Sequence, residues 1–205
     1  PANWQTLASG YNSDDRVVQI GWYPYGLFGT LRDMIGVENL LLLFYDDLDL
    51  IHTMMEDLTS FWLSIYEKVC QQVRIDLIHI WEDMSGKNGP LISPAMMREF
   101  MLPQYKHIKA FADAHKIPVF AVDTDGDVER MIPVLVEGGV NMLLPFEVIE
   151  GCKSIVDYRR EYPSLCIMGG ISKLEIAKGR EAIDGELERL REVFDIGTGF
   201  IPALD

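Results

Sequence analysis

The chain has 205 residues, enough to bury a sizeable core, and its composition is that of an ordinary globular protein. Its net charge of −14 excludes nucleic acids and anionic membrane surfaces as partners, because both repel an acidic protein. Three cysteines without CxxC spacing predict a reducing compartment, the cytoplasm, and no apolar run approaches the roughly 20 residues that a membrane-spanning helix needs.

Apolar runs that could form strands alternate along the chain with stretches of helical periodicity. The strands are expected at 16–23, 75–81 and 117–122, in the run that ends at 145–147, and at 165–168 and 199–205. A loop or short helix is expected through Gly36, and helices at 48–74, 93–116, in the stretch that ends at Glu137, at 153–161, from Ser172, and at 180–194. No linker or repeat interrupts this alternation, so residues 1–205 are predicted to form a single domain.

Three local signals set expected helix boundaries. Asp46 or Asp47 is the predicted N-cap of the long helix, because a carboxylate can accept a hydrogen bond from a free amide of the first turn. Ser93 is the predicted cap of the next helix, with Pro94 at its first position. Pro103 should end or kink that helix near Leu102, because proline lacks the N–H that a helix interior requires.

Strands separated by helices predict a parallel sheet, for which two architectures compete. An open doubly wound sheet should carry a glycine-rich phosphate turn after an early strand, and this sequence has none. Polar residues follow nearly every predicted strand, which favours a (β/α)8 barrel that builds its site from many strand ends. Six strands cannot close an eight-stranded barrel, and both ends of the chain look cut. We therefore expect an incomplete barrel, truncated at both ends.

Acidic residues gather where the predicted strands end. Parallel strands bring their carboxyl ends to one rim, which should place together the residues Glu82, Asp83, Asp123, Asp125, Glu147 and Asp205. Such a rim suits a hard metal ion with oxygen ligands, a cationic substrate, or acid/base chemistry. The alternative is that Asp125 and Asp127 only cap the helix that follows them.

Other candidate residues lie near the same rim. His79 shares a strand face with Asp83, and it is either a proton shuttle or a hydrogen-bonded core residue, of which the second is the commoner case. An aromatic group after the first strand could form a wall over a planar ligand, or only cover the barrel mouth; it comprises Trp22, Tyr23, Tyr25 and Phe28. Arg32 and Lys87 are the nearby cations.

An ordered series of motifs along nearly the whole chain resembles the uroporphyrinogen decarboxylase superfamily. The series comprises FGTLRD at 28–33 with Ile35-Gly36, Glu82-Asp83, GPLISP at 89–94, DTDGD at 123–127, LPFE at 144–147, GGISK at 169–173 and GFIP at 199–202. The resemblance implies a (β/α)8 barrel of which this chain supplies about strands three to eight. It also implies one of two chemistries: decarboxylation of a porphyrinogen, or methyl transfer that involves corrinoid proteins.

The sequence departs from both branches of that superfamily. Decarboxylases have a tyrosine where Arg32 falls and a serine where Asp83 falls, and their polycarboxylate substrate would be repelled by an acidic rim. The thiol-activating methyltransferases hold zinc with a His-x-Cys pair where Asp123 and Asp125 stand here. Zinc also accepts carboxylate oxygen. The chain thus looks like a divergent branch that usually has His-Ser-Asp-Gly where this sequence has Asp-Thr-Asp-Gly at 123–126. Members of that branch resemble methyltransferases of anaerobes.

The leading hypothesis is a corrinoid-linked methyltransferase that acts on a small methylated substrate. Asp123, Asp125 and Glu147 would hold a divalent metal such as zinc or orient the substrate; Asp83 would serve in acid/base chemistry beside Asp123, and Arg32 would anchor an anionic group.

The implied corrinoid is carried by a partner protein, and the predicted substrate contacts are Trp22, Tyr23, Glu82 and His79. The alternatives are uroporphyrinogen decarboxylation in tetrapyrrole biosynthesis and a non-catalytic paralogue that only binds a small molecule.

Overall fold

The strands of the computed structural model, which describes residues 3–13 and 15–204, form one parallel sheet and one small hairpin. The sheet has six strands in the order β1-β2-β5-β6-β7-β8, and every neighbouring pair is parallel. Its strands are β1 (Gln19–Gly21), β2 (Leu77–Trp81), β5 (Val119–Asp123), β6 (Met142–Phe146), β7 (Cys166–Ile171) and β8 (Phe200–Leu204). The antiparallel hairpin joins β3 (Ser85–Gly86) to β4 (Gly89–Pro90) directly after β2.

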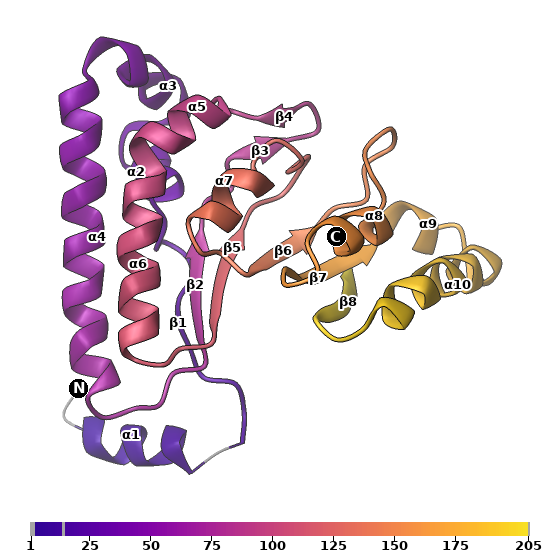
Figure 1. Cartoon of the computed structure of the whole chain (residues 1–205), viewed down its shortest axis with the longest axis horizontal. Helices are drawn as coiled ribbons and strands as arrows, with labels where there is room; N and C mark the ends of the chain where they lie inside the picture. Colours follow the sequence, from indigo (N-terminus) through magenta and orange to yellow (C-terminus); the bar gives the residue numbers. More distant parts are fainter. Residues whose placement is uncertain (1–2, 14, 205) are drawn as a thin grey trace.

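The helices connect successive strands and cover one side of the curved sheet. They are α1 (Trp4–Asn12), α2 (Phe28–Ile35), α3 (Val37–Asp46), α4 (Leu48–Cys70), α5 (Pro94–Met96), the π-helix η1 (Met97–Met101), α6 (Leu102–Ala114), α7 (Ile132–Glu137), α8 (Ile155–Glu161), α9 (Lys173–Ile176) and α10 (Arg180–Ile196). Figure 1 shows α4 and α6 running alongside β1, β2 and β5, whereas α8 and α10 lie with β6 to β8. The helix α1 crosses the foot of the sheet, at the end away from the hairpin.

Alternation along the strands divides the sheet into two faces. Ile78 pairs with Phe120 and Ile80 with Val122, and these side chains join the main core beneath the helices. On the other face a small cluster forms from Leu77, Ala121 and Met142, with Val119, Leu144, Cys166 and Met168 packed partly buried against it. That second face is the concave, inward side of a barrel wall.

The fold class agrees with the prediction. Six parallel strands separated by helices form an α/β barrel wall that is not closed, as expected for an incomplete (β/α)8 barrel. Within the described residues, no helix combines the length and the apolar character needed to cross a membrane.

The three predicted boundary signals are confirmed. The Asp47 side chain accepts a hydrogen bond from the amide of Leu50 at the start of α4. Ser93 caps α5 through the amide of Met96, with Pro94 at the first position. Pro103 lacks the N–H that would bond to the Glu99 carbonyl. The helix is accordingly interrupted by the π-helical turn η1, which ends immediately before Leu102.

The main differences between the predicted and the observed elements lie in the first strand, at 37–46, at 82–92 and in α7. Only Gln19–Gly21 of the first predicted strand is paired, since Trp22 adopts a φ of 81° that ends the strand. The apolar run at 37–46 forms the helix α3, which was not predicted, and the loop at 82–92 contains the hairpin. The helix α7 starts only at Ile132, so Asp125 and Asp127 do not cap it; Asp127 instead accepts from the amide of Glu129 in a turn.

Replacement of Gly26 by alanine should destabilise the protein by about 2 kcal/mol, because a Cβ there would overlap the carbonyl oxygen of Trp81. Urea unfolding measures the loss. The matched control is Gly185→Ala in the exposed part of α10, where a Cβ meets nothing within 4 Å. That control should gain about 0.5 kcal/mol from its higher helix propensity. Equal unfolding free energies for the two variants would contradict the expected overlap.

Candidate functional site

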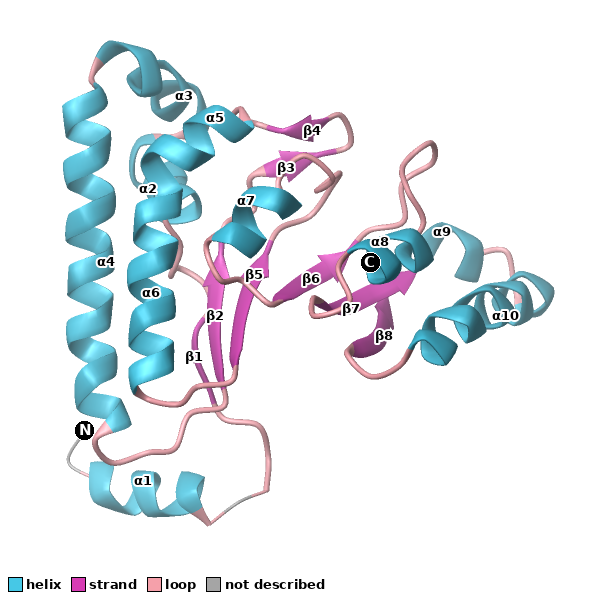
Figure 2. Cartoon of the chain, in the orientation of Figure 1, coloured by secondary structure: helices cyan, strands magenta, loops and turns pink. Residues whose placement is uncertain are grey.

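Acidic side chains lie at the carboxyl ends of three adjacent strands. Asp123 is the last residue of β5, Asp125 lies two residues beyond it, and Glu147 directly follows β6. The backbone locks these ends together: the amides of Glu82 and Asp83 donate to the Asp123 carbonyl at 2.8 and 3.1 Å. The predicted member Asp205 lies outside the described residues. Figure 2 shows the hairpin β3–β4 above these strand ends.

The Asp125 carboxyl group is influenced by the charges of the three other rim carboxylates. Burial raises its pKa, and so do the neighbouring charges of Glu147, Asp83 and Asp123, in decreasing order of effect; Lys173 acts weakly in the opposite direction. The side chain is half-buried, so it stays accessible to a small molecule. Of the predicted rim acids, Glu147, Asp83 and Asp123 therefore lie close enough to Asp125 to raise its pKa.

Two of the rim carboxylates have fixed partners. Glu147 accepts from the Lys173 ammonium at 2.9 Å with one oxygen and from the Gly126 amide at 2.8 Å with the other. An Asp123 oxygen lies 3.0 Å from Nε2 of His79. Only 5% of His79 is exposed, and its Nδ1 has no protein partner among the described residues. His79 is therefore a buried, hydrogen-bonded residue that also belongs to the rim through Asp123.

Arg32 of α2 closes the rim on the β2 side. Its guanidinium donates to the Asp83 carbonyl oxygen at 2.6 Å and lies 2.7 Å from the Asp83 carboxylate. It also lies over the Trp81 ring, 4.9 Å from the centroid. Asp83 adopts a φ of 40°, in the left-handed region that L-residues seldom occupy. The strained backbone of Asp83 turns both of its oxygen acceptors towards one arginine.

The predicted aromatic wall is only half present. Trp22 and Tyr23 are 55% and 57% exposed, and Tyr23 packs edge-on against Trp81 with centroids 4.9 Å apart. Tyr25 and Phe28 are buried in the core and cannot touch a ligand, which corrects that part of the prediction. Trp22 and Tyr23 therefore stay the aromatic candidates for substrate contact.

Glu82 does not face the rim. It is fully buried, and its carboxylate accepts from the amides of Leu27 and Gly29 and from the Tyr105 hydroxyl. Burial raises its pKa to about 7, although these hydrogen bonds favour the charged form. The structure thus places Glu82 away from substrate, in contrast to its neighbour Asp83. No sequence motif marks Tyr105, its partner from α6.

The predicted metal ligands do not form a metal centre in this arrangement. Within residues 3–13 and 15–204, no group of three or more His, Cys, Asp or Glu side chains has the spacing to hold a metal ion. Lys173 supplies the positive charge beside Glu147 that a cation would otherwise provide. Metal binding by Asp123, Asp125 and Glu147 therefore stays a prediction, and no chemical step below depends on it.

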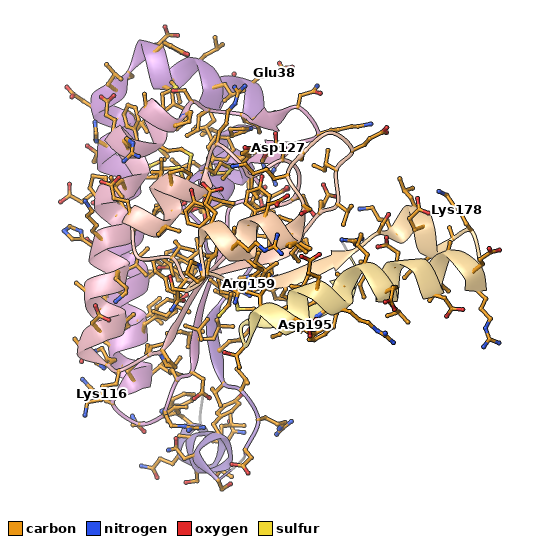
Figure 3. All side chains as sticks on the ribbon, turned by 45° about the vertical axis from the view of Figure 1, so that its right-hand side comes forward. Glu38, Lys116, Asp127, Arg159, Lys178 and Asp195 are labelled. Atoms are coloured by element: carbon orange, nitrogen blue, oxygen red, sulfur yellow. The ribbon has the colours of Figure 1, made fainter. Side chains whose placement is uncertain are left out.

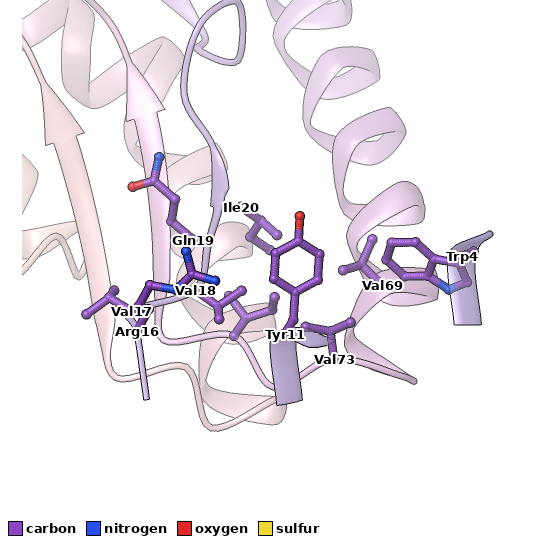
Figure 4. Close-up of a pocket in the computed structure, with 10 residues that line it drawn as sticks. Trp4, Tyr11, Arg16, Val17, Val18, Gln19, Ile20, Val69 and Val73 are labelled. Atoms are coloured by element: carbon purple, nitrogen blue, oxygen red, sulfur yellow. The ribbon is translucent and has the colours of Figure 1, made fainter. Parts of the chain in front are cut away.

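Two cavities lie at opposite ends of the strands. One, of about 630 Å³, opens beside Glu147 and is lined by Lys87, Lys173, Leu174 and Arg189 among others. The other, of about 430 Å³, lies at the foot of the sheet between α1, β1 and the end of α4 (Figure 4). Tyr11 and Trp4 from α1 lie on one side of it, with Val69 of α4 and Val73, which follows that helix, on the other (Figure 4). Barrel chemistry is built at the carboxyl ends of strands, so the cavity beside Glu147 is the one that belongs to the candidate site.

Comparisons with known proteins agree with this architecture. A family model described as uroporphyrinogen decarboxylase (URO-D) matches residues 24–204. Among solved structures, the chain is similar to a methyltransferase from Methanosarcina mazei, with a TM-score of 0.70 at 17% sequence identity. That match covers 98% of this chain but only 56% of the other, and it shows the fold. A comparison with curated proteins found no match.

The family model covers well over half of the sequence, and the motifs at the rim, including Asp83, Asp123 and Glu147, lie inside the matched range. The chain belongs to the uroporphyrinogen decarboxylase family.

Proposed function

We propose that this chain works in corrinoid-linked methyl transfer, with a small methylated substrate bound at the carboxyl rim. The observation that carries the proposal is the convergence of four carboxylates, Asp83, Asp123, Asp125 and Glu147, on one half-buried position. Arg32 and Lys173 offset the charges of Asp83 and Glu147, which leaves Asp123 and Asp125 to repel a polycarboxylate such as a porphyrinogen. A neutral or cationic methylated molecule would not be repelled. The fold shared with a methyltransferase supports the same choice.

The proposed chemistry needs a proton at the atom that loses its methyl group. When a methyl group leaves oxygen, nitrogen or sulfur, the bonding electron pair stays on that atom, and a nearby acid can protonate it. Asp125 is the candidate acid, since it is half-buried among three other carboxylates and accessible from the rim. A methyl acceptor that supplies the electron pair of the new bond, such as the reduced corrinoid of a partner protein, would complete the balance.

The other rim residues would position the substrate. Trp22 and Tyr23 are both exposed, and Tyr23 packs against Trp81, the ring over which Arg32 lies. Asp123, held by His79, and Glu147, held by Lys173, fix the floor of the site. Arg32 already has Asp83 as its carboxylate partner, so an anionic group of the substrate would have to displace Asp83 to be anchored there.

The test follows the transfer in the reverse direction, as protein-dependent demethylation of methylcobalamin with a thiol, a phenol or an amine as methyl acceptor, and absorbance measures the reaction. The full-length protein should accelerate the reaction with at least one acceptor. Asp125→Asn, which removes the proposed acid, should lower the rate by about 100-fold. The control Arg180→Ala should leave it unchanged, because that side chain is 95% exposed at the start of α10.

Two results would overturn the proposal. One is a lack of demethylation with every acceptor. The other is the formation of coproporphyrinogen from uroporphyrinogen by the same protein, which would establish decarboxylation instead.

A further inference from the structure

Glu82 is the most completely buried carboxylate at the rim end of the sheet, and all its contacts are to the helical layer. One oxygen, Oε2, accepts from the amide of Leu27 at 3.1 Å and from the amide of Gly29 at 3.2 Å. The other, Oε1, accepts from the Tyr105 hydroxyl at 2.9 Å. Leu27 and Gly29 lie at the start of α2, so one carboxylate caps the amides that this helix leaves free.

The start of α2 is also pressed against the end of β2. A Cβ at Gly26 or at Gly29 would overlap the Trp81 carbonyl oxygen, so the backbone of this segment lies directly on the strand. The Trp81 amide donates to the Tyr25 carbonyl at 2.7 Å just before that segment. These close contacts fix the position of the start of α2 on the end of β2.

Arg32 lies one helical turn after Gly29, and its guanidinium binds Asp83, the residue that follows Glu82. Two consecutive residues of the β2 end therefore hold α2 at two points. Glu82 binds the backbone of its first turn, and Asp83 binds the side chain of Arg32.

We propose that Glu82 is a positioning residue, which fixes the start of α2 and thereby sets where the Arg32 guanidinium lies at the rim. A negative charge at a helix N-terminus is stabilised by the free amides and the helix dipole. This stabilisation favours the position of α2 in which its first turn lies against the Glu82 carboxylate. The part that Arg32 plays in catalysis rests on the proposed function. Its placement by Glu82 does not, since that placement exists without substrate.

The experiment follows two signals in the full-length protein by NMR, with no substrate present. One is the Arg32 side-chain Nε–H resonance; the other is hydrogen exchange at the Leu27 and Gly29 amides. Glu82→Leu keeps the bulk but removes the acceptors, and should displace the Arg32 signal and lower protection at both amides by about tenfold or more. Glu82→Gln keeps an acceptor oxygen and should restore most of the wild-type signal.

Core protection separates positioning from general stability. The amides of β5, such as that of Val122, should keep their protection relative to Leu27 and Gly29, because a merely structural role would lower protection throughout. The proposal is overturned if Glu82→Leu leaves the Arg32 signal at its wild-type position, or if protection falls equally in β5. Should Glu82→Leu fail to fold, Glu82→Asp decides, because the shorter side chain withdraws the carboxylate from the Leu27 and Gly29 amides. A displaced Arg32 signal with β5 protected then supports the proposal, and a wild-type signal overturns it.

Discussion

Replacement of Asp125 by asparagine should stabilise the protein and remove most of its methyl-transfer activity. Burial and the charges of Glu147, Asp83 and Asp123 raise the pKa of Asp125, so the folded state holds its proton more tightly than the unfolded chain does. The stability that this group contributes is complete below the unfolded pKa and is lost as the pH rises through the folded pKa. At pH 8 the wild-type protein therefore carries a repulsion that asparagine lacks.

The expected gain in the free energy of unfolding at pH 8 is at most about 1 kcal/mol, because the side chain is partly exposed and solvent screens the charges. The gain should shrink as the pH falls through the folded pKa, and urea unfolding across that range measures it. The rate of methylcobalamin demethylation should fall by about 100-fold or more. Asparagine can neither donate a proton to the atom that loses its methyl group nor, in the reverse direction that this assay follows, accept the proton of the methyl acceptor.

The matched control is Asp57→Asn, which makes the same change of charge on an exposed position of α4. It should alter neither activity nor the pH dependence of stability. An Asp125→Asn variant that keeps full activity would remove Asp125 from the proposed chemistry. A variant that is destabilised at pH 8 would show that the neighbouring carboxylates do not repel it.

The order of elements could be predicted because each strand is an apolar run that a turn or helix signal ends. The position of the acidic rim followed from the same rule, since Asp123 and Glu147 directly end such runs. The partners of those acids could not be predicted. Lys173 lies 26 residues after Glu147, and only the parallel pairing of β6 with β7 brings the two together.

Glu82 shows where a simple rule could have improved the prediction. Side chains alternate along a strand, so Glu82 shares a face with Ile78 and Ile80, which are fully buried under the helices. Asp83 lies on the other face with His79. Two adjacent acids at one strand end therefore have different surroundings, and the apolar neighbours at a spacing of two residues mark the buried one.

The burial of Tyr25 and Phe28 has no comparable sequence signal. Both belong to the same aromatic group as the exposed Trp22 and Tyr23. Which of the four side chains are buried depends on how α2 packs against β2 and α4. Tyr25 packs edge-on against Trp62 and Tyr66 of α4, about 40 residues away in the chain. Tertiary packing of this kind, rather than local pattern, decides which aromatic side chains remain available to a ligand.

Arg159 should be among the most sensitive positions for stability, although no motif marks it. Only 2% of this residue is exposed, and Figure 3 places it in the crowded centre of the side chains, whereas Lys116 and Lys178 lie at the periphery. From α8 its guanidinium donates to the carbonyl of Leu165, just before β7, and to the carbonyl of Thr198 at 2.6 Å, just before β8. One side chain thus joins a helix to the starts of two strands.

Arg159→Met keeps much of the side-chain volume but removes both donors. The buried carbonyl of Leu165 and the part-buried carbonyl of Thr198 then lack their partner, and the free energy of unfolding should fall by about 3 kcal/mol. Local exchange should also rise at the amides of β8, since the Thr198 contact fixes the turn into that strand. Urea unfolding and hydrogen exchange measure the two effects.

The neighbouring Arg160 provides the control, because it pairs with Glu192 on the surface and is largely exposed. Arg160→Met should cost less than about 0.5 kcal/mol, as surface ion pairs usually do. If the two variants lose the same free energy, burial of the Arg159 guanidinium does not hold α8 to the sheet. If Arg159→Met alone is destabilised and β8 exchanges faster, the buried arginine fixes the last strand, and with it the curvature of the barrel wall that carries the acidic rim.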